Sequence, residues 1–117
     1  MTPATGGTVP ATLIMENETG TDLIWTAVTP GPAGNNLTLQ FTWNLVPNTP
    51  LSVALVGGVN IEVTLGTGPV GNLISTGSDI AALVNSTPAL SALVTVTVFN
   101  GTFPESPFGP LNFFGGH

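Results

Sequence analysis

The chain has 117 residues, with six acidic side chains, one histidine and no lysine or arginine, which gives a formal net charge of -6. Because lysine and arginine supply most of a protein's affinity for phosphate groups, this composition excludes nucleic-acid binding and disfavours anionic membrane surfaces. A chain of this length can form one domain without disulfide bonds or metal ions, and its apolar runs are too short to span a membrane.

Residues 1–20 combine Thr, Pro, Gly and Ala around one short apolar group, Leu13-Ile14-Met15. The low periodicity and two prolines predict an N-terminal arm that is either disordered or ordered only against a neighbouring subunit. After this arm, residues 23–28 are rich in large and β-branched side chains, and strong turn formers follow at residues 29–35. We therefore expect a strand and then a loop.

Residues 37–43 alternate apolar and polar side chains, which predicts a half-buried strand. Two further runs of this kind, residues 51–56 and 59–65, flank Gly57-Gly58. Because consecutive glycines accept the positive φ angles of a tight turn, these two runs are predicted to form a β-hairpin.

The run Thr76-Gly77-Ser78-Asp79 resembles a helix capping box, and the apolar spacing after it predicts a short helix over residues 77–86. Thr87-Pro88 repeats the start signal, so one further helical turn is expected through Leu93. Residues 94–98 then alternate Val and Thr, which predicts a return to strand.

The tail, residues 100–117, is rich in Phe and Pro and is too apolar to be left wholly in water. It is expected to pack on the core or on a neighbouring subunit. The predicted organisation is therefore an arm over residues 1–20, a β-rich core domain over residues 21–99 and this tail. The predicted fold class is α+β and mostly β, an antiparallel, sandwich-like sheet with one short helical element and extended terminal arms.

The titratable residues give little support to catalysis. Glu62 and Asp79 would be the pair for acid–base hydrolysis, but a solvent-facing strand residue and a helix cap are the favoured readings. The single histidine, His117, has nothing in the sequence to fix its geometry as a base. Calcium binding near Glu16, Glu18 and Asp22 lacks the EF-hand spacing, so a solvated turn is favoured. We expect no enzyme activity, no metal site and no cofactor.

Three segments together resemble a small β-rich module of the structural proteins of tailed bacteriophages. They are the strand, glycine loop and strand over residues 22–39, the hairpin over residues 53–65, and the capped helix with its second turn over residues 75–94. The ending Leu111-Asn112-Phe113-Phe114-Gly115-Gly116 is also similar to the end of that module. The resemblance covers residues 20–116, and the chain departs from it by lacking every basic residue.

This resemblance implies a virion protein without catalysis, and a chain that consists of one such module looks most like a capsid decoration (cement) protein. The implied location is the outer surface of the capsid, and the implied partners are the major capsid protein and further copies of the chain in a homotrimer. The residues predicted to form the contacts are Leu13, Ile14, Met15, Phe108, Phe113 and Phe114.

Two alternatives stay open at this point. A domain of a tail tip or fibre could bind host glycans through Trp25 or Trp43, because aromatic rings stack on sugars, or through exposed Asn and Thr residues. An extracellular adhesin or pilus-like subunit could instead assemble by strand exchange.

Overall fold

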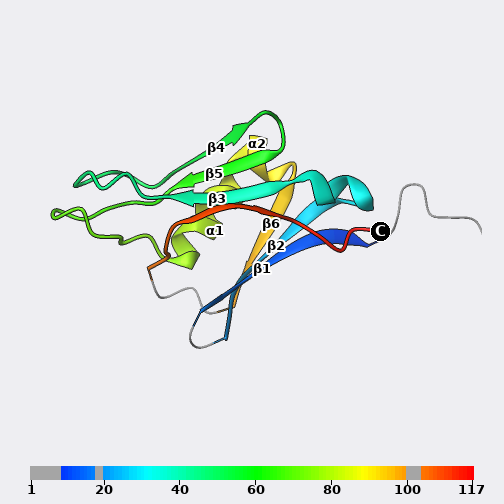
Figure 1. The fold of residues 1–117 in the computed structure, drawn as a ribbon, viewed down its shortest axis with the longest axis horizontal. Helices are drawn as coiled ribbons and strands as arrows, with labels where there is room; N and C mark the ends of the chain where they lie inside the picture. The colour runs from blue at the N-terminus through cyan, green and yellow to red at the C-terminus, as the bar shows by residue number, and fades with distance from the viewer. Residues whose placement is uncertain (1–8, 18–19, 100–103) are drawn as a thin grey trace, which may run out of the picture.

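The computed structural model describes residues 9–17, 20–99 and 104–117, and these form two β-sheets around one hydrophobic core. The three-stranded sheet has the order β1-β2-β6 and is antiparallel, with β1 at Pro10–Asn17, β2 at Gly20–Pro30 and β6 at Val94–Val98. In Figure 1 the strands of the second sheet lie over those of the first. The fold is therefore α+β and mostly β, as predicted.

The four-stranded sheet has the order β4-β5-β3-β7. Its strands are β3 at Thr38–Thr42, β4 at Ser52–Val56, β5 at Asn60–Thr64 and β7 at Phe108–Asn112. β4 and β5 form the predicted hairpin, and both glycines of its turn have positive φ angles. β4 runs in the direction opposite to β3, and the hairpin turn reverses the chain once more. β5 therefore lies beside β3 and pairs with it in parallel.

The helices cover the side of the core between β4 and β6, which are edge strands of the two sheets. α1, Gly77–Ser86, begins at the predicted capping box, in which the Thr76 hydroxyl accepts from the Asp79 amide and the Asp79 carboxylate accepts from the Thr76 amide. α1 contacts β6, and α2, Pro88–Ser91, contacts β4. A short 3-10 helix, η1 at Pro32–Asn36, replaces part of the expected loop. None of the described helices is long and apolar enough to cross a membrane.

The core fills the space between the sheets, and two of its largest side chains meet edge to face. The ring centroids of Trp25 and Phe41 lie 6.3 Å apart at an interplanar angle of 63°. Both rings are fully buried. The other fully buried large side chains come from both sheets, both helices and the C-terminal tail; they are Leu23, Leu39, Ile61, Val63, Leu65, Ile80, Val84, Leu90, Val94 and Phe113.

Both ends of the described chain contain a strand. Residues 10–17 form β1, a strand of the three-stranded sheet whose residues Ala11, Leu13 and Met15 face the core. The continuous run Leu13-Ile14-Met15 hides the alternation that a strand normally shows. In the tail, β7 pairs with β3 at the edge of the sheet, where Pro110 is tolerated because an edge strand needs fewer backbone donors. Residues 1–8 of the predicted arm lie outside the described residues.

Candidate interaction surfaces

The C-terminal segment joins the two sheets. After β7 it runs to the free edge of β1, where Phe114 exchanges two backbone hydrogen bonds with Thr12, of 2.9 and 3.0 Å. His117 exchanges two more with Val9, of 2.8 and 3.0 Å. The tail thus packs on its own domain, covers the first half of the β1 edge and ties the three-stranded sheet to the four-stranded one.

The tail is held by a second contact, between Asn35 of η1 and Gly116. The Asn35 side-chain amide donates to the Gly116 carbonyl at 3.1 Å, and the Gly116 amide donates to the Asn35 Oδ1 at 2.9 Å. A Cβ atom at Gly116 would collide with the Gly31 carbonyl oxygen and lie 3.1 Å from the Ala11 amide nitrogen. Only glycine therefore fits this site without a shift of the backbone.

Four of the six residues predicted to contact a neighbour pack in or against the protein's own core. Phe108 lies against Phe41 with ring centroids 4.5 Å apart, and the Met15 sulfur accepts a hydrogen bond of 3.1 Å from the Trp25 indole. Side chains that are already packed inside one subunit offer little surface to another. These four residues are Leu13, Met15, Phe108 and Phe113.

The other two, Ile14 and Phe114, point away from the core. Ile14 is 49% exposed and Phe114 is 61% exposed. Phe114 pairs with Thr12, and Ile14 lies two residues further along β1, so both adjoin the same side of the sheet. We call this side of the three-stranded sheet the outer face.

The outer face is uncharged in its described side chains. The strand register places Thr12, Thr26 and Thr95 in one row across the three strands, and the next row contains Ile14, Ile24 and Thr97. One row is therefore entirely threonine and the next is mostly isoleucine, and Phe114 lies beside them on the β1 side. These described rows can be buried against another protein without desolvating a charge.

The free edge of β6 is protected by a side chain. The Asn85 amide donates to the Val96 carbonyl at 3.1 Å, and the Val96 amide donates to the Asn85 Oδ1 at 3.1 Å. This pair of bonds replaces a neighbouring strand, which protects an edge of alternating Val and Thr from pairing with another chain. Strand exchange, as in the adhesin alternative, finds no free site at this point of β6.

The two tryptophans have different environments. Trp25 is fully buried and cannot stack on a sugar. Trp43 is 40% exposed, and its indole Nε1 donates to the Gly71 carbonyl at 2.9 Å. Of the two candidates for glycan binding, only Trp43 presents a ring surface to solvent.

The acidic residues do not gather into a described site. Asp79 caps α1, Glu62 accepts a hydrogen bond of 3.2 Å from Asn60, and Glu105 is buried. Within residues 9–17, 20–99 and 104–117, no group of three His, Asp or Glu could hold a metal ion. Three residues were considered above for calcium binding. Of these, Glu18 lies outside the described residues, as do the side chains of Glu16 and Asp22.

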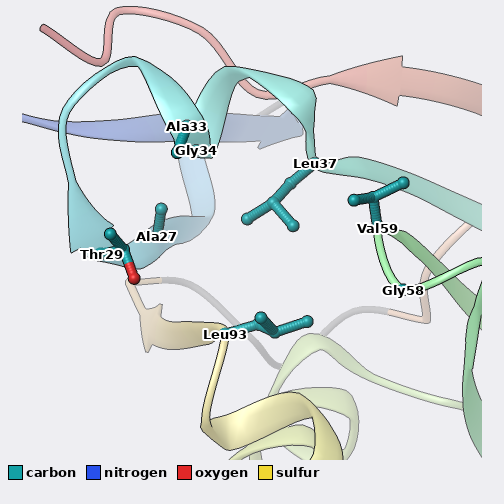
Figure 2. Close-up of a pocket in the computed structure, with 8 residues that line it drawn as sticks. All are labelled: Ala27, Thr29, Ala33, Gly34, Leu37, Gly58, Val59 and Leu93. Atoms are coloured by element: carbon teal, nitrogen blue, oxygen red, sulfur yellow. The ribbon is translucent and has the colours of Figure 1, made fainter.

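A small apolar pocket lies where β3 and β5 begin, between η1, the β4–β5 turn and the start of β6 (Figure 2). Its volume is about 170 Å³, which is close to that of a cavity able to hold one benzene ring. Leu37, Val59 and Leu93 line it, and Thr29 supplies the one polar side chain of its lining. The pocket can hold an apolar group but has no acid, base or nucleophilic thiol to act on it.

Comparisons of the chain with known protein families, with curated proteins and with solved structures found no match. The interaction surfaces must therefore be judged from their own geometry. The sequence indicated Ile14 and Phe114, whereas it gave no sign of the threonine rows, which only the pairing of three separate strands brings together.

Proposed function

We propose that this protein is a structural subunit of a virus particle, a capsid decoration protein that binds the outer surface of the head. The outer face of the three-stranded sheet carries this proposal, because its described side chains are apolar or carry hydroxyl groups and none of them is charged. Support also comes from the sequence resemblance to phage structural modules. The proposed partners are the major capsid protein and other copies of the chain, arranged as a homotrimer.

In this mechanism the protein performs no reaction. Burying the outer face against the shell would contribute about 25 cal/mol for each Å² of apolar surface that is removed from water. A molecule bound across the boundary between two capsomers would have to be released before the capsomers could separate. The net charge of -6 supports an external position, since the DNA inside a head is a strong polyanion.

Purified virions would test this proposal directly. Quantitative gel densitometry should find hundreds of copies per particle, located on the head, whereas a handful of copies at the tail would contradict it. The variant Ile14→Asp should reduce occupancy of the head at least tenfold, as expected for an interface anchor. Val56→Asp is the matched control, because Val56 is 48% exposed but lies on β4, away from the outer face. Equal occupancy of both variants would remove the outer face from the mechanism.

A second candidate function is a tail tip or fibre domain that binds host glycans. The partly exposed ring of Trp43 favours it, because its indole nitrogen is already bonded and its ring surface is available for stacking. This candidate predicts that the isolated protein binds host polysaccharide and that Trp43→Ala abolishes the binding. Equal binding by Trp43→Ala would exclude Trp43 as the sugar platform.

A further inference from the structure

Two long loops lie side by side at one end of the four-stranded sheet (Figure 1, left). The first connects β3 to β4, and the second connects β5 to α1. Since β3 and β5 are parallel neighbours, their C-terminal ends deliver both loops to the same end of the sheet. We call residues 43–50 and 66–74 together the loop platform.

Hydrogen bonds fix the two loops against each other. The Thr67 hydroxyl accepts from the Thr49 amide at 2.8 Å and donates to the Val46 carbonyl at 2.5 Å. The Asn48 amide donates to the Gly68 carbonyl at 3.0 Å. Because Thr67 is buried, its two bonds are shielded from water. The loop platform therefore has a defined shape before any partner binds, which lowers the entropy that binding must overcome.

The loop platform nevertheless displays large apolar side chains. Val70 is 84% exposed, Leu45 is 67% exposed, and Val46 and Trp43 are also exposed. Leu45 has a φ of 64°, in the left-handed region that bulky residues rarely adopt. Leu45 thus has a backbone conformation that costs free energy, while its side chain buries little surface within its own subunit. This combination points to a contact with another molecule.

The lack of charged side chains in the loop platform indicates which kind of molecule it contacts. Residues 43–50 and 66–74 contain no charged side chain, although the chain carries six acids elsewhere. A lipid bilayer is disfavoured, because no cation is present to bind headgroups and the irregular backbone would lose hydrogen bonds to water in hydrocarbon. A rigid surface of apolar side chains and backbone groups instead fits an uncharged protein surface of complementary shape.

We propose that the loop platform is a second docking surface, which binds an uncharged apolar patch on a neighbouring subunit of the shell. This inference rests on the proposed decoration function. The outer face belongs to the three-stranded sheet, whereas the loop platform lies at the end of the four-stranded sheet, so one molecule has two separate surfaces. Two surfaces allow a single molecule to bridge two capsomers, and each raises the effective affinity of the other.

The experiment uses heads purified from a deletion strain that lacks this chain, titrated with the full-length protein. Val70→Asp and Leu45→Gly should each weaken binding roughly tenfold or more. At saturation the bound amount should match that of the wild type, because the outer face still binds, but heat resistance of the heads should no longer increase. Leu45→Gly serves as the folding control, since glycine accepts the positive φ, and Val56→Asp should bind and stabilise as the wild type does.

Each other outcome has a distinct meaning. If the wild type does not bind the heads, the proposed function itself fails. If the wild type binds and stabilises the heads and Val70→Asp does so equally, the loop platform is not a docking surface. If Val70→Asp instead abolishes self-association of the free protein, the loop platform binds a second copy of the chain. If it abolishes binding to phosphatidylcholine vesicles, the loop platform binds a membrane. Either result overturns the proposal.

Discussion

Substitution of one glycine in the C-terminal segment should destabilise the whole domain. In Gly116→Ala the new methyl group would collide with the Gly31 carbonyl oxygen, so the tail must move away from Asn35. That movement breaks the two hydrogen bonds between Asn35 and Gly116, each worth about 1 kcal/mol, and weakens the pairing of the tail with β1. We expect a loss of about 2 to 3 kcal/mol in the free energy of unfolding.

Thermal unfolding measures this loss. For a domain of this size, a change of 1 kcal/mol shifts Tm by about 4 °C, so Gly116→Ala should unfold roughly 10 °C below the wild type. The amide of Thr12, which donates to the Phe114 carbonyl, should also lose protection from hydrogen exchange. Gly109→Ala is the matched control in the same segment, because a Cβ there meets nothing within 4 Å. Identical Tm values for the two variants would refute the steric argument.

Three further predictions concern other parts of the domain. Thr67→Val should lower the free energy of unfolding by about 2 kcal/mol, measured by urea titration, because it removes both side-chain bonds between the long loops, while Thr67→Ser should stay close to the wild type. Asn85→Leu should uncover the Val96 edge and cause concentration-dependent association in light scattering; a monomer at all concentrations would contradict this role. Acrylamide should quench Trp43 and spare Trp25, so Trp43→Phe should leave fluorescence that resists quenching; strong quenching of this variant would place Trp25 at the surface.

Elements whose signals are local in the sequence could be predicted. The capping box at Thr76 and Asp79 defines the start of α1 within four residues, and Gly57-Gly58 defines the turn of the hairpin. The parallel pairing of β3 with β5 could not be predicted in this way, because it depends on which edge of β3 the returning hairpin joins. The partnership of Asn35 with Gly116 spans 81 positions and has no local signature at all.

The interaction surface was predictable only in part, for a geometric reason. Leu13, Ile14 and Met15 are adjacent in sequence and were predicted to act as one contact. In a strand, successive side chains point to opposite faces, so Leu13 and Met15 enter the core while Ile14 faces outward. The pair Phe113 and Phe114 divides in the same way. Composition can identify an apolar segment, but the strand pairing decides which half of it stays available.

The pairing of Val9 with His117 has a practical consequence for engineering. These two residues lie within hydrogen-bonding distance of each other, so in a variant without residues 1–8 a short Gly-Ser linker could connect His117 to Val9 with a small loss of chain entropy. New termini could then be opened between Gly57 and Gly58, where the turn is exposed and a Cβ meets nothing within 4 Å. A protein fused to the new termini would lie at the tip of the β4–β5 hairpin. This tip is at the end of β5 opposite to the two long loops that follow β3 and β5.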